Sequence, residues 1–484
     1  MVHLMAKDGQ PLPDSAIQEL KSLPFEVVLG SEAIQDVYQV AINRYNKAWV
    51  LESGAIAFCE SESHVIGCLD FVQKWAVELA IACGRHSFYG ASSTANGLVI
   101  DLKKMNKVSI DKAAMTCTAG GGCRAIDLET PLQAENLSVV MGAINDTGIG
   151  GLTLGGGSGF LTGQHGLVCD NLLAATVVTA DGRVLKASGN ANADLFWGIR
   201  GGGSNFGIIT EFVYRVHDQG DVFFGPLIFA PVKIRAFLEM TETMVRIIET
   251  CRGKLTIFCA FAKGPQMAKV HPVALIFYDG PEEEAREHIA PLLELGPVRN
   301  LTNMRKFADI TYPSPQFAGL PGHQRFATTN VMMEPPLNVD AVEALANDFD
   351  AFMTKYGEAV APSRVMIELR DHAKTAAVAP SATAFRARRK AITLNMEVQY
   401  DYTVSDQLMR NEVKAMASKL RMATKKVRME DSNDDNLSLA NIADGNEKVV
   451  DLFGDNLPRL RVLKRRFDPD CVFNKWFPIP PADA

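Results

Sequence analysis

Glycine is concentrated in two short segments, and this feature limits what the chain can fold into more than any other. The first segment covers residues 148–159 and the second covers residues 201–207. Backbone without side chains can run close against a ligand and can point its N–H groups at phosphate oxygens. Two such segments indicate a large ligand, such as a dinucleotide, bound in an extended form. The alternative is a pair of tight turns that serve close strand packing.

Several familiar motifs are absent from the sequence. It contains no Gly-x-x-x-x-Gly-Lys-Ser/Thr loop and no Gly-x-Ser-x-Gly elbow of a serine hydrolase. Residues 120–125 imitate the Gly-x-Gly-x-x-Ala turn of a Rossmann fold, which leaves a nicotinamide dehydrogenase as an alternative. The acidic residue expected after the next strand is missing, because residues 139–141 are followed by Gly142. No His-Glu-x-x-His or Cys-x-x-Cys is present, so we expect no metal site.

The length and charge of the chain set its broad class. A chain of 484 residues is too long for one hydrophobic core, so we expect two or three folded units. Glycine becomes sparse after residues 218–220, where we place a domain boundary, and residues 445–484 differ again in pattern. The chain has 49 Lys and Arg against 56 Asp and Glu, and this net charge of −7 argues against nucleic acid as a partner.

Cysteine usage and hydropathy indicate where the protein works. The nine cysteines are odd in number and lack paired spacing, as expected for free thiols in a reducing compartment. No apolar run approaches the ~18 residues that a membrane helix needs. The N-terminal residues lack the layout of a secretory signal. We therefore expect a cytoplasmic enzyme with no membrane partner.

One histidine lies at a distinctive place. We expect a buried strand over residues 55–59, a helix over residues 63–79 with Ser63 as its N-cap, and a second buried strand over residues 79–83. This β-α-β stretch ends directly in a Gly-x-His-Ser turn that contains His86. A structural role is the usual expectation for an arbitrary histidine, but His86 follows a buried strand and lies in a glycine-rich turn. Further along we expect helices over residues 339–355 and 450–466, and strands over residues 363–369 and 392–400.

Taken in order, these segments resemble a known family. Residues 84–90 are similar to the Gly-Gly-His-Ser-x-x-Gly flavin-attachment turn of the berberine-bridge-enzyme-like FAD-linked oxidoreductases. That family belongs to the vanillyl-alcohol-oxidase superfamily, with its p-cresol-methylhydroxylase-type FAD domain. The similarity covers roughly residues 50–218 and 445–484 and is loose over residues 220–444. The matching segments after the turn are residues 98–102, 147–151, 155–161, 165–171, 194–201, 205–212, 454–460, 467–469 and 472–474.

The resemblance implies an α+β fold. An FAD-binding domain of two α+β subdomains is completed by the C-terminal segment, and a substrate domain of antiparallel sheet and helices is inserted. Residues 1–218 would bind FAD, residues 219–444 the substrate, and residues 445–484 would return to the FAD domain. The flavin 8α carbon would be bonded to His86. The implied cofactor-binding residues are Gly84, Arg85, His86, Ser87, Gly90, Thr147, Gly148, Gly151, Gly155, Gly157, Leu161, His165, Gly166, Asp170, Asn171, Gly207, Ile208, Phe473 and Asn474.

Three positions depart from the family pattern. Arg85 stands where a second glycine is common; a guanidinium suits a pyrophosphate but could also crowd the turn. Many relatives add a cysteinyl bond to the flavin at the position of Ile144, so we expect one covalent bond at most, through His86. Many also carry a tyrosine two residues before the asparagine that matches Asn441. Leu439 stands there, so that position supplies no tyrosinate base.

The resemblance also implies the chemistry. A small-molecule substrate would lose a hydride to flavin N5 while a base removes a proton. The electrons would then pass to O2 and give hydrogen peroxide. A flavin-dependent cyclase or isomerase of a biosynthetic pathway is the alternative, and Leu439 favours it. No cluster of acids or aromatics defines the substrate, which we expect to be a secondary metabolite, an alcohol or a sugar.

Relatives place a catalytic polar side chain on the strand that matches residues 392–400. The period of a strand puts Asn395, Glu397 and Gln399 on one face and the intervening apolar residues on the other. Glu397 is our candidate base, with Asn395 and Gln399 beside it. A solvated strand face is the alternative explanation. His372 and Tyr400 are weaker candidates.

Overall fold

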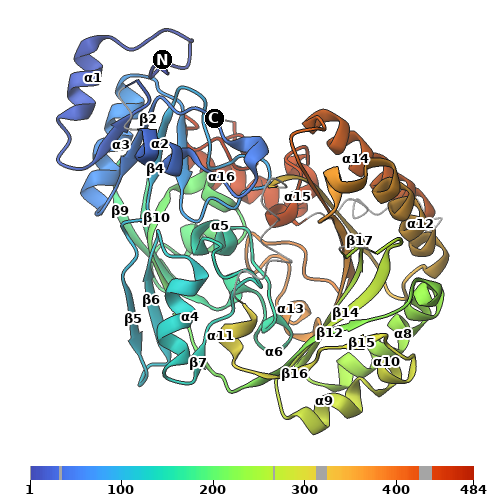
Figure 1. Ribbon diagram of the computed structural model, residues 1–484. Coiled ribbons are helices and arrows are strands. Elements are labelled where there is room, and N and C mark those ends of the chain that lie inside the picture. The colour runs from blue at the N-terminus through green and yellow to red at the C-terminus, as the bar shows by residue number, and fades with distance from the viewer. Residues whose placement is uncertain (1, 32–34, 265–266, 312–323, 425–438, 484) are drawn as a thin grey trace.

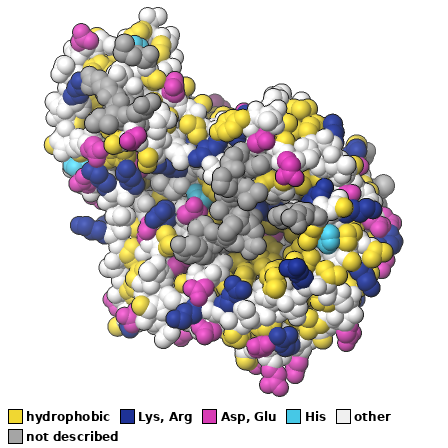
Figure 2. Space-filling view, viewed as in Figure 1, with side chains coloured by type: hydrophobic (Ala, Val, Ile, Leu, Met, Phe, Trp, Pro, Cys, Tyr) yellow, Lys and Arg dark blue, Asp and Glu magenta, His cyan; other side chains and the backbone are white. Residues whose placement is uncertain are grey.

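The computed structural model describes residues 2–31, 35–264, 267–311, 324–424 and 439–483 (Figure 1). These residues form four sheets with helices between and around them, so the predicted α+β class is confirmed. The N- and C-termini lie close together in Figure 1, beside the small N-terminal sheet. Among the residues that the structure describes, no helix is both long and apolar enough to cross a membrane. Acidic and basic side chains are interspersed on the face in Figure 2.

The N-terminal sheet has the order β1-β2-β4-β3. Its central strands are parallel because α3 (Glu62–Lys74) connects β2 to β3, as the β-α-β pattern predicted. The N-cap prediction was wrong: the Ser61 hydroxyl, two residues before Ser63, accepts from the His64 N–H. The bounds are α1 (Asp14–Lys21), β1 (Val27–Leu29), α2 (Gln35–Ile42), β2 (Ala55–Phe58), β3 (Leu79–Ala82) and β4 (Leu98–Asp101).

The second sheet has the order β5-β6-β10-β8-β9, and all of its pairs are antiparallel. Gly120 ends β6 and residues 121–122 follow it. Because β6 has no parallel neighbour, these residues cannot form the Rossmann turn that they imitate. The first glycine cluster includes the short helix α5 (Ile149–Leu154). The other elements here are β5 (Val108–Asp111), β6 (Thr116–Gly120), α4 (Ala125–Gln133), β7 (Leu137–Ser138), α6 (Thr162–His165), β8 (Leu172–Val178), β9 (Val184–Ser188), α7 (Ala193–Ile199), β10 (Ile208–Arg215) and β11 (His217–Asp218).

The third large sheet is antiparallel and has eight strands, in the order β15-β12-β14-β13-β18-β19-β17, with β16 paired to β12. Helices α8, α12 and α14 cover its outer face in Figure 1. Its bounds are β12 (Val222–Ile228), α8 (Ile234–Thr250), β13 (Leu255–Ala262), β14 (His271–Tyr278), α9 (Glu282–His288), α10 (Ala290–Glu294), β15 (Arg299–Asn300), β16 (Asn303–Arg305), α11 (Phe307–Ile310), β17 (Arg325–Met333), α12 (Val339–Tyr356), β18 (Arg364–Arg370), α13 (Ala373–Ala376), β19 (Ile392–Tyr400) and α14 (Asp406–Thr424).

The inner face of this sheet packs against the glycine-rich part of the chain. Phe160, just after the first glycine cluster, stacks on Phe277 of β14 with ring centroids 5.0 Å apart. Strand alternation places Leu394, Met396 and Val398 of β19 in the core beneath the helices. Their odd-numbered neighbours therefore face the glycine-rich part, as the sequence predicted.

The C-terminal segment returns to the second glycine cluster. The single helix expected over residues 450–466 is wrong, because the chain breaks into α15 (Val449–Phe453) and α16 (Leu457–Phe467). Gly454 between them has a φ of 45°, which ends the first helix. The buried Lys464 of α16 donates to the carbonyl of Asn205 in the second cluster, 2.9 Å away.

Candidate active site

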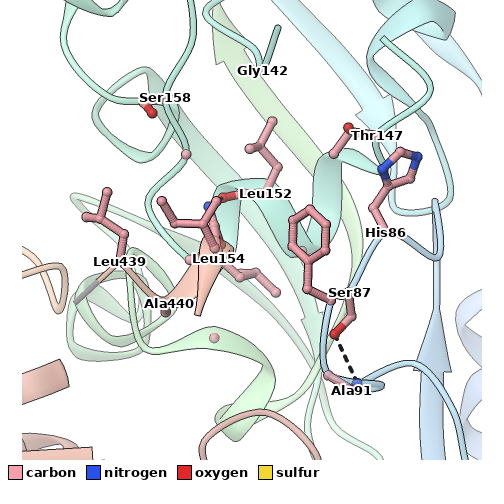
Figure 3. Close-up of a pocket in the computed structure, with 18 of the residues that line it drawn as sticks. His86, Ser87, Ala91, Gly142, Thr147, Leu152, Leu154, Ser158, Leu439 and Ala440 are labelled. Atoms are coloured by element: carbon pink, nitrogen blue, oxygen red, sulfur yellow. Dashed lines mark hydrogen bonds between the residues drawn. The ribbon is translucent and has the colours of Figure 1, made fainter. Parts of the chain in front are cut away.

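One cavity lies where segments far apart in the sequence meet, and its volume is about 420 Å³. One side is formed by the turn after β3, by α5 and by the loops around α5. The opposite side is the inner face of β17, β18 and β19. Residues 439–442, just before the C-terminal segment, and residues 472–476 within it close the cavity further, and Figure 3 shows Leu439 and Ala440 near Leu154. A cavity of this size and mixed lining is typical of a site for a small molecule or part of a cofactor.

The glycines of the first cluster divide into two kinds. A Cβ atom on Gly148 would lie 2.2 Å from the backbone N of Gly84 in the His86 turn, so these two residues are glycine because their backbones touch. A Cβ on Gly155 would lie 1.7 Å from Asn441 Oδ1. Gly151 is different, since it lines the cavity and no described atom lies within 4 Å of the place of its Cβ. Packing therefore explains part of the cluster, and Gly151 leaves a bare backbone surface for a ligand.

The structure brings most of the predicted cofactor-binding residues together at the cavity and leaves the others outside its lining. Those that line it are Gly84, Arg85, His86, Ser87, Thr147, Gly148, Gly151, Gly155, Gly157, Gly207, Ile208, Phe473 and Asn474. Those that lie outside are Gly90, Leu161, His165, Gly166, Asp170 and Asn171.

The predicted residues that lie outside the cavity lining have structural roles. Gly90 has a φ of 84°, and a Cβ there would lie 2.6 Å from the Trp49 ring. Asp170 pairs with Arg388 at 2.7 Å and also accepts from the backbone of residue 167. The Asn171 amide donates to the carbonyls of residues 165 and 167. Residues 165–171 thus form a turn held by these hydrogen bonds and by Arg388, and within it Leu167 lines the cavity.

His86 is held on two sides. Its ring stacks on Tyr45, with centroids 4.3 Å apart and planes at 19°, and Tyr45 in turn stacks on Phe326 of β17. Its Nε2 atom lies 3.1 Å from Oδ1 of Asp146. Burial raises the pKa of Asp146, but contact with His86, a backbone hydrogen bond and the charge of Arg124 together outweigh burial, so the pKa lies below its ordinary value. Asp146 is therefore ionised at neutral pH, and in Figure 3 Thr147 lies beside the His86 ring.

Arg85 neither crowds the turn nor presents a free charge. Its φ of 64° is in the left-handed region, where the family's usual glycine fits more easily. The guanidinium forms an ion pair with the fully buried Asp101 at the end of β4, and Nη1 donates to the Val40 carbonyl at 2.8 Å. The side chain is thus turned toward the N-terminal sheet.

The inner face of the large sheet carries a row of polar side chains. Arg364 of β18 lies directly across from Glu397 of β19, and they form an ion pair at 2.6 Å with side-chain exposures of 8% and 10%. The Asn395 amide donates to Oε1 of Glu368 at 2.8 Å, and Glu368 also pairs with Arg370. The Asn395 Oδ1 atom is buried and has no hydrogen-bond donor in the described chain. It lies in the cavity lining as an acceptor.

The other candidates for a catalytic role differ in position. Gln399 lies outside the cavity lining and donates to Oε1 of Glu397 at 2.8 Å. His372 lines the cavity, and burial, Arg370 and Lys390 together lower its pKa to about 4, so it is neutral at pH 7. Tyr400 faces the outer helices and donates its hydroxyl to Asp406 at 2.7 Å, away from the cavity.

Sequence reasoning missed four residues of the site. Arg364 and Glu368 carried a usable signal, because alternation along the predicted strand 363–369 puts both on one face. Tyr45 and Asp146 carried none, since each meets His86 only through the tertiary fold. Ile144 and Leu439 line the cavity with hydrocarbon, where many relatives have a cysteine and a tyrosine.

Comparison with known proteins identifies the class. Residues 53–188 match the family model of the FAD binding domain, and residues 439–480 match the model "Berberine and berberine like". The solved structure of BBE-like 1 from Physcomitrella patens superposes with a TM-score of 0.82 at 21% identity, covering 97% of this chain and all of that one. Berberine bridge enzyme in complex with (S)-reticuline gives 0.81 at 19% identity, covering 97% of this chain and 99% of that one. At these identities the likeness shows the fold.

The FAD-linked oxidoreductase pgmH of Aspergillus terreus is 41% identical over 483 residues, which is 98% of each chain. The FAD-linked oxidoreductase OXR1 of Pyricularia oryzae is 30% identical over 87% of this chain and 82% of its own length. This chain belongs to the berberine-bridge-enzyme-like family of FAD-linked oxidoreductases, as the sequence resemblance predicted. It is an FAD-dependent enzyme.

The described residues fit FAD. Besides the open surface at Gly151, buried polar atoms of the cavity lining lack hydrogen-bond partners in the described chain. They belong to Tyr89, Ser92, Thr375, Asn395 and Asn474. Buried polar groups are nearly always satisfied in native proteins. A ligand that combines a polar chain with a flat ring system satisfies such atoms and covers the apolar lining as well.

Proposed function

We propose that this enzyme oxidises a hydroxyl-bearing small organic molecule, with FAD bonded to His86 alone and O2 as the electron acceptor. The observation that carries the proposal is the row of polar side chains on β18 and β19 opposite the turn of His86. FAD would be held by the turn 84–87, by the backbone around Gly148 and Gly151, and by Phe473 and Asn474 of the C-terminal segment. Bound FAD supplies a hydride acceptor whose electrons pass to O2.

The hydrogen bonding of Asn395 favours a substrate that carries a hydroxyl group. A carboxylate only accepts hydrogen bonds, so Glu368 fixes which end of the Asn395 amide it meets. The amide N–H2 points to Glu368, and Oδ1 remains as the free acceptor. Leaving a buried acceptor unpaired costs about 1–3 kcal/mol. A substrate O–H that donates to Oδ1 removes this cost, whereas an ether or a hydrocarbon does not.

We assign the base to Glu397. Its Oε1 atom pairs with Arg364 and accepts from the Gln399 amide, so the carboxylate is held in one position at the cavity. Its burial beside Asn395 lets one substrate hydroxyl reach both side chains. His372 is the weaker candidate, because it lies beyond the end of β18 and outside the row of polar side chains on β18 and β19.

Names of structural neighbours favour an oxidase. Two of them are a chitooligosaccharide oxidase and a xylooligosaccharide oxidase solved with xylobiose. A cyclase or isomerase is the second candidate, favoured by the hydrocarbon side chain of Leu439 at the cavity and by the berberine bridge enzyme among the neighbours. Ile144 supports the proposal of a single covalent bond, because its side chain has no sulfur to form a second one.

The test is direct. Purified holoenzyme is mixed anaerobically with a panel of alcohols, phenols and oligosaccharides, each paired with its methyl ether, while flavin absorbance at the visible maximum is followed. We expect bleaching by hydroxylated compounds only, and peroxide release when air is admitted. Equal bleaching by a methyl ether would refute the role of the hydroxyl. Conversion of a compound without bleaching or peroxide would favour the cyclase or isomerase.

A further inference from the structure

We propose that Asp146 and Tyr45 are positioning residues for the attachment of FAD to His86. Asp146 orients the imidazole and neutralises the charge that grows on it, and Tyr45 holds its plane. The inference rests on the proposed covalent bond at His86. It gives a role to two residues that have none in the proposed oxidation.

The chemistry of attachment defines what the imidazole needs. A C–N bond replaces one C–H bond of the flavin 8α methyl group and one N–H bond of the imidazole. Two protons and two electrons are released, and O2 takes them up to become hydrogen peroxide. The attacking ring nitrogen uses its lone pair, so the ring becomes cationic until the proton on its other nitrogen leaves.

Asp146 is placed for this task. Its Oδ1 lies 3.1 Å from Nε2 of His86. That atom is buried, and His86 is the side chain that contacts it, while the charge of Arg124 also acts on the carboxylate. A carboxylate beside one ring nitrogen favours the tautomer with the proton on that nitrogen and leaves the lone pair on the other. It also stabilises the cationic ring, as the aspartate of a catalytic triad does.

Tyr45 fixes the ring from its flat side. The Tyr45 N–H donates to the Arg85 carbonyl at 3.1 Å, so the stacked tyrosine is tied to the turn that carries His86. The next residue, the buried Asn46, donates to the carbonyls of Phe88 and Phe326, and the Phe326 N–H donates to Asn46 Oδ1. Residues 45–46 thus fasten the attachment turn to β17 of the large sheet. The imidazole sits between this fastening and Asp146 with little freedom to turn.

The experiment follows the covalent bond rather than turnover. Cells are harvested at short intervals after induction, and flavin fluorescence of the denatured band is divided by protein amount. Asp146→Asn removes the charge and keeps the volume. We expect its covalent fraction to grow about 10-fold or more slowly than wild type, while FAD bound without a covalent bond remains. Asp340→Asn is the matched control, because it makes the same change at an exposed carboxylate that pairs with Arg235 outside the cavity, and its time course should equal wild type.

A second pair of variants tests the ring. Tyr45→Phe keeps the stack and should attach FAD within about twofold of the wild-type rate, whereas Tyr45→Leu should be slowed about 10-fold. Superimposed time courses for Asp146→Asn and wild type would overturn the role of Asp146. Equal rates for Tyr45→Leu and Tyr45→Phe would overturn that of Tyr45. A covalent flavin that persists in His86→Ala would instead overturn the proposed bond itself, so the two failures are distinguishable.

Discussion

Replacing Lys464 by Met should loosen the C-terminal segment from the FAD-binding part of the molecule. The side chain of Lys464 is fully buried, and its Nζ donates to Asp468 at 2.5 Å, to the Asn205 carbonyl at 2.9 Å and to the Phe473 carbonyl at 2.7 Å. Asp468 in turn accepts from the backbone N–H groups of residues 472 and 473. One ammonium group therefore joins α16, the second glycine cluster and the cavity residue Phe473.

The magnitude follows from what the substitution leaves behind. Removing one partner of a buried ion pair costs about 3–5 kcal/mol, because the other charge stays buried without compensation. The two backbone N–H groups that still bind Asp468 moderate this loss, so we expect about 3 kcal/mol. For a unit of this size, 1 kcal/mol lowers the melting temperature by about 2–4 °C. We therefore predict a drop of roughly 10 °C.

Thermal unfolding of the holoenzyme, followed by tryptophan and flavin fluorescence, measures the effect. Arg465→Met is the matched control: it removes a cation from the next position of α16, where the side chain is exposed, and should change the melting temperature by less than about 2 °C. The double variant Lys464→Met/Asp468→Asn should recover part of the loss, because no buried charge remains. A melting temperature for Lys464→Met within about 2 °C of wild type would show that the buried pair does not hold the segment.

Three further predictions concern the cavity. Gly151→Leu should lower flavin content at least 10-fold while the far-ultraviolet circular dichroism spectrum is unchanged, because the leucine side chain would fill space at the cavity that we assign to FAD. Undiminished flavin content would contradict the role of Gly151 as a surface for FAD. Glu397→Gln should keep its FAD but slow anaerobic bleaching by a hydroxylated substrate about 100-fold or more, and an unchanged rate would exclude it as the base. His372 has its pKa lowered to about 4, so the folded state resists its protonation, and stability is full above pH 6.5 and falls toward pH 4. At pH 5 this loss is about 2 kcal/mol, and the melting temperature of His372→Gln should fall less between pH 7 and pH 5 than that of wild type.

Local patterns predicted the elements and one wall of the site. The alternation that put Asn395 and Glu397 on one face of β19 depends only on strand geometry, and the core residues Leu394 and Met396 confirm it. This pattern does not predict which other side chain each of these residues pairs with. Arg364 meets Glu397 because β18 and β19 pair in one particular register, and register is set by the whole sheet.

Helix limits failed where a single residue outweighed a good pattern. Residues 450–466 have helical spacing, yet Gly454 adopts a positive φ and divides them. The predicted cap was Ser63, but the extended backbone of Ser61 and the hydrogen bond from the His64 N–H to its hydroxyl place the cap two residues earlier.

Glycine has two roles at this cavity, so a glycine-rich pattern alone does not show which residues contact a ligand. Gly84 and Gly148 would be glycine even without a ligand, because their backbones touch. Gly151 alone of these three has open space where a side chain would be. Arg85 completes the argument, since its ion pair with Asp101 uses a charge that could otherwise have met a phosphate. The turn that carries His86 is therefore stabilised by the N-terminal sheet and by its contact with Gly148, and a phosphate would have to be bound by backbone N–H groups rather than by this arginine.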